Sequence, residues 1–131
     1  MDGATTNAGS HVAEIKRELL EATSYYSADY FSARQWFLST SAKLGLKHYA
    51  LPIRAPSPNS EPLTIDVTVA GALKPTTAIV LSSGVHGVEG FFGSAVQLAF
   101  LEQFATSWQP PPGAAIIFIH AINPFGFAPR K

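Results

Sequence analysis

Two side chains with the chemistry of metal ligands, His86 and Glu89, lie three residues apart in the segment SSGVHGVEG (82–90). An imidazole nitrogen and a carboxylate oxygen are both common zinc ligands, and this spacing at the start of a helix lets them turn toward one point. The glycines of the segment give the main chain room and unusual backbone angles near a metal and a substrate. We therefore expect His86 and Glu89 to form half of a zinc site.

The glycine-rich segment 82–90 also fits other interpretations. An H-x-x-E pattern is short, and a histidine at a strand end is commonly a hydrogen-bonded structural residue. The G-x-x-G-x-x-G spacing differs from the G-x-G-x-x-G of dinucleotide-binding loops, and no acidic residue ends a second strand about 20 residues later. Ser82 and Ser83 do not form the G-x-S-x-G elbow of serine hydrolases. A nucleotide-binding loop stays open as an alternative, whereas a serine nucleophile is disfavoured.

The elements around this segment predict where it lies in the fold. Ala78–Leu81 and Ala114–Ile119 are short, continuously apolar runs, which are typical of strands covered on both faces. Between them, a helix over about Glu89–Ala105 is apolar on nearly all sides, as expected for a buried crossover in a right-handed βαβ unit. The segment 82–90 then lies at the carboxyl end of a parallel strand, where ligand sites of open α/β sheets gather.

Two helices are predicted before the sheet. Ser10 can cap the first, and Gly45 ends the second just after Lys43. Apolar residues recur at helical spacing in both, at Val12, Ile15, Leu19 and Ala22 in the first and at Tyr30, Ala33, Phe37 and Leu44 in the second.

Two strands are predicted between the second helix and the βαβ unit. Along Lys47–Ile53, larger apolar residues alternate with other residues, which indicates a strand. Pro52 has no backbone N–H to donate, which favours an edge position for that strand. Leu63–Ala70 alternates between apolar and polar residues, which predicts a half-buried strand with Asp66 on its polar side. We expect Asp66, like His11 and His48, to be a surface or structural residue. The fold class is therefore α/β, with a mixed, mainly parallel central sheet and flanking helices.

The composition excludes several classes of function. Nine Lys and Arg balance nine Asp and Glu, so no basic surface for nucleic acid is expected. The absence of cysteine rules out thiolate metal sites and cysteine nucleophiles, and any metal must be bound by His, Asp or Glu. No apolar run reaches the roughly 20 residues that cross a bilayer. We expect a cytoplasmic protein that acts on a small-molecule or peptide substrate, with neither nucleic acid nor membrane as a partner.

Four words of the sequence carry a resemblance to a known family: YYSADYFSARQWFLSTSAKLG (25–45), LTIDVTVAG (63–71), SSGVHGVEGFFGSAVQ (82–97) and HAINPFGFA (120–128). Together they resemble an uncharacterised branch of the zinc carboxypeptidase superfamily, related to the succinylglutamate desuccinylase and aspartoacylase group. The resemblance implies a carboxypeptidase-like fold and zinc-dependent hydrolysis of an amide bond, in a peptide or an N-acyl amino acid.

Residue roles follow from the resemblance at matching positions. The superfamily's H-x-x-E pair maps onto His86 and Glu89 as two zinc ligands. His120 and Asn123 belong to the H-A-[IV]-N-P word, so both are possible site-lining residues, although a hydrogen-bonded loop role for His120 and a turn role for Asn123 fit equally. The resemblance further implies a third His ligand, a Glu general base and a substrate-binding Arg downstream, and none has a counterpart here. Arg130 receives no role.

The resemblance also predicts how the chain is organised. The family continues into an Arg- and Asn-rich stretch where this chain reads Pro129-Arg130-Lys131. We therefore expect residues 10–131 to be the N-terminal portion of a single zinc-hydrolase-like domain, inactive alone, after a disordered tail over residues 1–9. Two alternatives stay open: a non-catalytic, truncated or degenerate relative serving as a binding or inert module, and a nucleotide-binding α/β domain.

Overall fold

The computed structural model describes residues 9–14, 23–103 and 109–129. Residues 9–14 are helical, so the first predicted helix is present there, but Gly9 and Ser10 already belong to it and are not tail and cap as expected. The rest of that helix, the tail before Gly9, the end of the crossover helix and Arg130 lie outside the described residues. Among the helices of the described ranges, none combines the length and apolar character needed to cross a membrane.

A four-stranded sheet forms the body of the molecule, with the strand order β1-β2-β4-β3. The strands are β1 (Lys47–Pro52), β2 (Thr64–Gly71), β3 (Thr77–Ser82) and β4 (Ala114–His120). β3 and β4 are parallel, whereas β1–β2 and β2–β4 are antiparallel. The mixed α/β fold is confirmed, but the sheet is mainly antiparallel and not mainly parallel as expected, because a single βαβ crossover is present among these strands. β1 lies at an edge, as its proline predicts.

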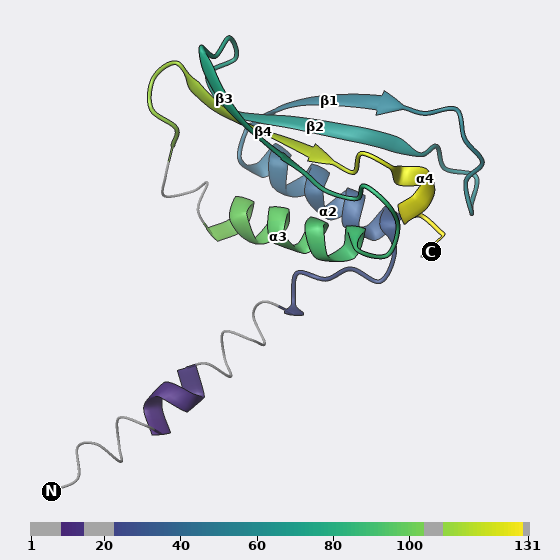
Figure 1. Cartoon of the computed structure of the whole chain (residues 1–131), viewed down its shortest axis with the longest axis horizontal. Helices are drawn as coiled ribbons and strands as arrows, with labels where there is room; N and C mark the ends of the chain where they lie inside the picture. The colour runs from purple at the N-terminus through teal and green to yellow at the C-terminus, as the bar shows by residue number, and fades with distance from the viewer. Residues whose placement is uncertain (1–8, 15–22, 104–108, 130–131) are drawn as a thin grey trace, which may run out of the picture.

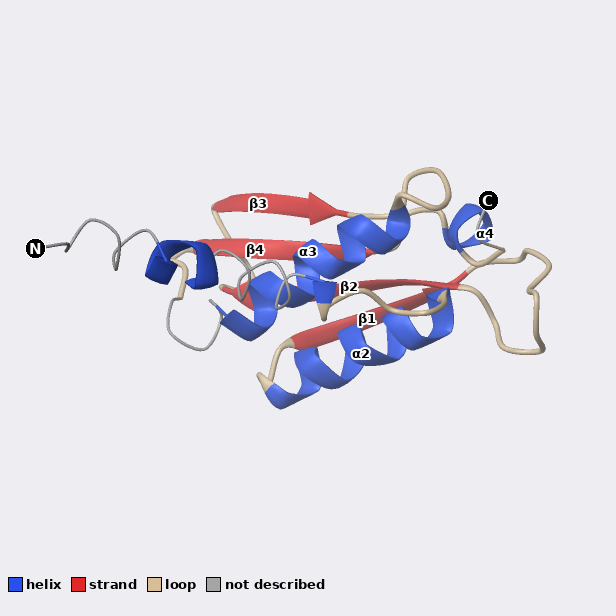
Figure 2. Ribbon diagram, turned by 90° about the horizontal axis from the view of Figure 1, so that it is seen from below, coloured by secondary structure: helices blue, strands red, loops and turns tan. Residues whose placement is uncertain are grey.

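Both long helices, α2 (Tyr30–Lys43) and α3 (Gly90–Gln103), cover the same face of the sheet (Figures 1 and 2). The Asp29 side chain caps α2 by accepting a 2.7 Å hydrogen bond from the Ser32 amide. Gly45, with φ of 67°, follows its end, as predicted. The stripe of Tyr30, Ala33 and Phe37 is buried against the sheet, which confirms the helical spacing seen in the sequence.

The polar side of β2, and not the apolar side, faces these helices. Its buried residues Thr64, Asp66 and Thr68 alternate with partly exposed apolar ones. Asp66 is fully buried because Arg34 donates two hydrogen bonds to its carboxylate, at 2.7 and 3.1 Å, and His48 Nε2 lies 2.9 Å from Oδ1. Of the two roles expected for Asp66 and His48, surface or structural, the structure supports the structural one.

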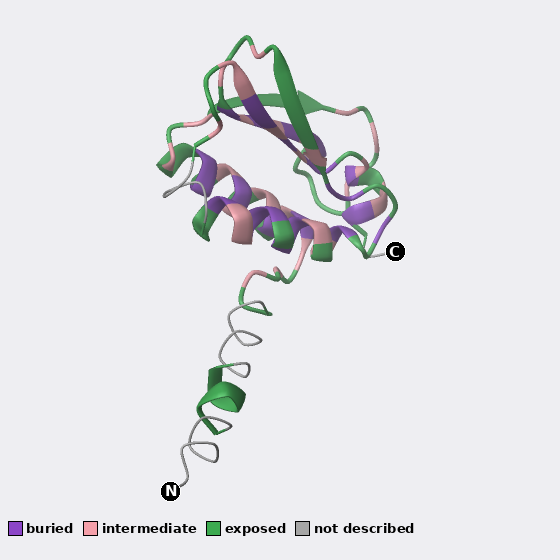
Figure 3. Ribbon diagram, turned by 60° about the vertical axis from the view of Figure 1, so that its left-hand side comes forward, coloured by how far each residue is buried: buried purple, intermediate pink, exposed green. Residues whose placement is uncertain are grey.

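β3 is an exposed edge strand in the described structure, so the expectation that it is covered on both faces is wrong. Ile79 and Val80 are 58% and 55% exposed, while β4 lies inside the sheet and is largely buried. α3 is likewise one-sided, with Phe92 and Val96 exposed, and not buried all round (Figure 3). The reason is that no described element flanks β3 on its outer side or covers the second face of the sheet.

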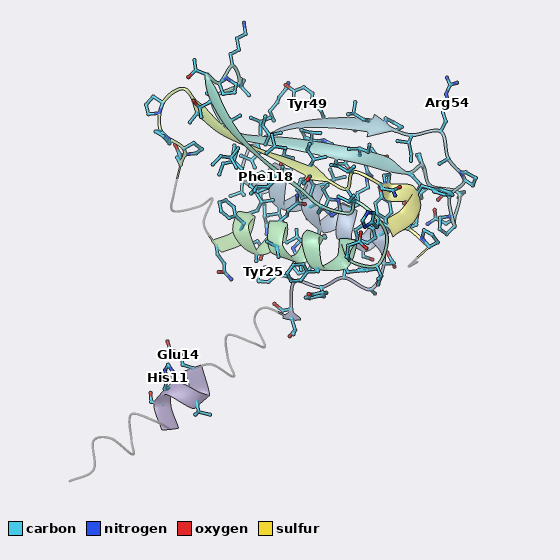
Figure 4. The ribbon with its side chains drawn as sticks, in the orientation of Figure 1. His11, Glu14, Tyr25, Tyr49, Arg54 and Phe118 are labelled. Carbon is cyan, nitrogen blue, oxygen red and sulfur yellow. The ribbon has the colours of Figure 1, made fainter. Side chains whose placement is uncertain are left out.

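The apolar core lies between the sheet and the two helices. Its larger cluster joins Phe37 of α2, Leu98 and Leu101 of α3, and Phe118 of β4, which is labelled in Figure 4. A second cluster around Tyr30, Leu63, Ala121 and Phe127 lies where β4 ends and the one-turn helix α4 (Pro124–Phe127) begins. This second cluster supports the loop that carries His86.

Candidate metal centre

The loop from Ser83 to Glu89 leaves the carboxyl end of β3 and enters α3, so the structure places His86 and Glu89 where the sequence predicts. Gly84 has φ of 67°, and a Cβ there would lie 2.6 Å from the Ala121 Cβ. A Cβ on Gly90 would overlap the ring of Phe127. These two glycines are therefore required by close packing of the loop on residues 121–127.

The Glu89 carboxylate turns back onto the loop that precedes its own helix. It accepts hydrogen bonds from the Gly87 amide, at 2.9 Å to Oε1 and 2.8 Å to Oε2, and from the His86 amide. The bond from Gly87 is the largest cause that lowers the Glu89 pKa, and the His86 amide acts in the same direction. Glu89 is consequently ionised at neutral pH, which is the form that binds a cation.

His86 and Glu89 lie side by side at the surface. The distance from His86 Nδ1 to Glu89 Oε1 is 3.8 Å, and the two side chains are 85% and 48% exposed. The carboxylate accepts from two loop N–H groups, and the Gly87 N–H reaches both of its oxygens. An imidazole nitrogen and a carboxylate oxygen are donor types that zinc binds, so the two side chains suit two positions of a zinc site.

A complete metal site needs more donors than these two. Within the described ranges, no group of three or more His, Cys, Asp or Glu side chains lies close enough to bind a metal ion. Catalytic zinc generally has three protein ligands and an open position. The third ligand that the family resemblance implies therefore has no counterpart among the described residues.

The structure places His120 in the core, away from the surface that His86 and Glu89 share. Its side chain is fully buried, its Nε2 lies 2.8 Å from the Ser94 hydroxyl, and its ring stacks on Phe37 at 4.7 Å. Burial lowers the His120 pKa to about 4, against an opposing effect of the Asp66 charge. His120 is therefore a neutral, hydrogen-bonded core residue at neutral pH, and it does not line an open site.

Asn123 contacts the candidate centre through the main chain of the loop. Its Oδ1 accepts the Gly126 amide at 3.0 Å and so caps α4, which confirms the turn predicted for N-P-F-G. Its Nδ2 donates to the carbonyls of Val85 and His86, at 3.1 and 3.3 Å. Asn123 thus lies beneath the loop and beside His86.

Sequence reasoning missed Gln97, which joins the two parallel strands below the loop. Its side-chain amide donates to the carbonyls of Leu81 and Ile119, at 2.8 and 3.1 Å, and its oxygen accepts the Ser83 hydroxyl at 3.0 Å. The signal available in the sequence was a single amide side chain within the apolar run of α3. A polar residue on a buried helix face must have hydrogen-bond partners, and the strand ends supply them.

An open groove continues from the candidate centre along α3 and β3. Its lining includes His86 and Glu89 together with the apolar side chains of Val80, Phe92 and Val96. The centre therefore borders a surface that is largely apolar.

Comparison with known proteins assigns a family to most of the chain. The model of a family of proteins of unknown function, DUF2817, matches residues 26–131. No curated protein matches. Among solved structures, a cytosol aminopeptidase from Coxiella burnetii is similar with a TM-score of 0.40 and 10% sequence identity, over 71% of this chain and 26% of that one. The chain thus spans about a quarter of that aminopeptidase's length.

Proposed function

Since the chain belongs to the DUF2817 family of proteins of unknown function, we propose a function from the site itself: zinc-dependent hydrolysis of an amide bond, with His86 and Glu89 as two zinc ligands. The observation that carries the proposal is the meeting of an exposed imidazole and an ionised carboxylate at the carboxyl end of a parallel strand. The superfamily resemblance of the same two residues supports it independently.

The residues of this chain have defined parts in such a reaction. Glu89 stays ionised because the loop amides stabilise its charge, and His86 presents its ring to solvent beside it. When bound, zinc supplies a Lewis acid and lowers the pKa of water toward ~7 for attack on a carbonyl carbon. The groove along α3 is the adjacent surface for a peptide or an N-acyl amino acid substrate.

Binding and turnover are separate expectations for the 131-residue chain. Catalytic zinc generally has three protein ligands, so two ligands should bind zinc only weakly, and hydrolysis also needs a third ligand and a general base. We therefore propose that the chain alone binds zinc with little or no turnover.

The arrangement of the loop amides disfavours the nucleotide-binding alternative. Phosphates bind at helix N-termini because free backbone amides point at them. Here the amides of His86 and Gly87 donate to the Glu89 carboxylate, so a phosphate would meet a negative charge in the position that it needs. The alternative of a non-catalytic or inert module differs from the proposal in its metal binding, which is open to direct measurement.

Zinc titration of the purified 131-residue chain, followed by calorimetry at neutral pH, tests the proposal. We expect one zinc ion per chain, with the affinity reduced at least about tenfold in His86→Ala and in Glu89→Gln, because each removes a metal donor. His11→Ala is the matched control, since it removes an exposed histidine from another part of the chain, and should leave the affinity unchanged.

Two results would contradict the zinc proposal. One is the absence of zinc binding, or binding that both His86→Ala and Glu89→Gln leave intact. The other is thermal stabilisation by ATP or NAD that persists in the presence of a zinc chelator, which would favour the nucleotide-binding domain.

A further inference from the structure

We infer that Asn123 is a positioning residue of the candidate metal centre, which fixes the main chain of Val85 and His86 and thereby the place of the His86 ring. The inference rests on the proposed function for its chemical meaning. Its structural part, the fixing of the loop by the Asn123 side chain, stands on the hydrogen bonds of the described residues.

The His86 ring depends on its backbone for its position. The side chain is 85% exposed, and its nearest charged neighbour is Glu89 at 3.8 Å. Within the part of the chain that the structure describes, no hydrogen bond orients the imidazole itself. The position of the ring therefore follows the main chain at His86, and whatever fixes that main chain fixes the ligand.

Four hydrogen bonds join this main chain to residues 122–123. The amides of Ile122 and Asn123 donate to the carbonyls of Ser83 and Gly84, at 2.8 and 2.7 Å. Those two bonds end before the metal-binding part of the loop. The Asn123 side chain continues the contact with its bonds to the carbonyls of Val85 and His86, and so reaches the ligand residue itself.

The seat of α4 against the loop is tight. A Cβ on Gly126 would overlap the carbonyl oxygen of His86, and it would lie 2.8 Å from Asn123 Nδ2. Gly126 also donates its amide to Asn123 Oδ1. The side chain of Asn123 is thus fixed on one side by α4 while it fixes the loop on the other.

Only an amide side chain performs both tasks. The carboxamide has an acceptor for the Gly126 amide and two donor hydrogens for the two loop carbonyls, whereas an aspartate is an acceptor only. Aspartate is also a good helix cap. Asn123→Asp therefore preserves the cap of α4 and removes the two bonds to the loop, placing a carboxylate against two carbonyl oxygens.

The test compares Asn123→Asp and Asn123→Ala with the wild-type 131-residue chain, first without metal. Amide hydrogen exchange at His86 and Gly87 should become at least about tenfold faster in both variants, because the loop opens more readily. Exchange at the centre of β4 should stay unchanged. Asn59→Asp introduces the same charge in an exposed loop and serves as the matched control.

Zinc titration of the same variants supplies the second readout. We expect the affinity of Asn123→Ala to fall about tenfold, the range seen when groups that orient metal ligands are removed. Wild-type exchange at His86 and Gly87 in both variants would overturn the inference, as would faster exchange combined with unchanged zinc affinity in Asn123→Ala. If the wild-type chain binds no zinc, the proposed function fails, while the exchange rates still decide whether Asn123 fixes the loop.

Discussion

His120 is a titratable residue in a place that suits only its neutral form. The ring is fully buried between Phe37 and the Ser94 hydroxyl, and burial brings its pKa down to about 4 from the ordinary value of 6.5. The unfolded chain therefore binds a proton at this residue at pH values where the folded chain does not. Acidification between these two values favours unfolding.

The stability of the chain should consequently fall as the pH is lowered from 6.5 to about 4, by roughly 3 to 4 kcal/mol from His120 at roughly 1.4 kcal/mol per pKa unit. Below that range both states carry the proton and the contribution is constant. Chemical denaturation across this pH range, compared with His120→Gln, measures it, because the variant lacks the titrating group. Glu89 also contributes to the pH dependence. Its pKa is lowered from 4.5, so the stabilisation that it gives is lost only as the pH falls below about 4.5, in the wild type and the variant alike. Parallel pH profiles of wild type and variant would exclude this role for His120.

At the scale of the elements, the loop before α3 and the one-turn helix α4 form one packed unit. Gly90 begins α3 directly against the ring of Phe127, which itself packs edge-on against Tyr30 and Phe91. The ring is fully buried, so it has little room to move away from an added atom. The contact explains why the start of α3 carries a glycine, which is otherwise a poor helix former.

Gly90→Ala should therefore destabilise the chain by about 2 kcal/mol, in the range of overpacked cores, although alanine has the better helix propensity. Equilibrium denaturation provides the measurement. Gly9→Ala is the matched control, because no atom lies within 4 Å of an added Cβ there, and it should change stability by less than about 0.5 kcal/mol. A Gly90→Ala chain as stable as wild type would show that Phe127 yields freely.

The elements also show how far the sequence alone could lead. Local periodicity of apolar residues and turn chemistry were enough to predict several features. These are the buried stripe of α2, its end at Gly45, the edge position of β1 and the place of the His86 loop between β3 and α3. The burial of Asp66 was not, because it depends on Arg34 and His48, which are 32 and 18 residues away. The hydrogen bonds that the Asn123 side chain donates were not predicted either, for the same reason. The turn at Asn123 has a local sequence signature, whereas the two carbonyls that accept these bonds lie 37 and 38 residues away and have none.

At the scale of the whole molecule, the second face of the sheet is apolar and lacks a covering layer among the described residues. In β4, Phe118 and His120 face the helices, so Ile117 and Ile119 between them face the other way. The strand register extends this apolar face across all four strands, through Tyr49, Leu51, Ile65, Val67, Val69 and Val80. A large exposed apolar face beside an unpaired edge strand favours association.

We therefore expect the 131-residue chain to self-associate in a concentration-dependent manner. Sedimentation velocity over a range of concentrations would measure this, and Val80→Lys should weaken the association by placing a charge on the exposed face of the edge strand. Gln109→Lys, at an exposed position after α3, adds the same charge as a control. A monodisperse monomer that unfolds cooperatively at every concentration would contradict the expectation.

Gln97 cross-links β3 and β4 at the end of their paired region, where Ser82 lies opposite Ile119. One side-chain nitrogen of Gln97 donates to the carbonyls of Leu81 and Ile119. These bonds keep the two strands together at the point where they diverge toward the His86 loop and α4. Loss of that cross-link would let the two segments drift apart together with the parts of the site that they carry. Substitution of Gln97 would then loosen the candidate site before it affected the global stability of the fold.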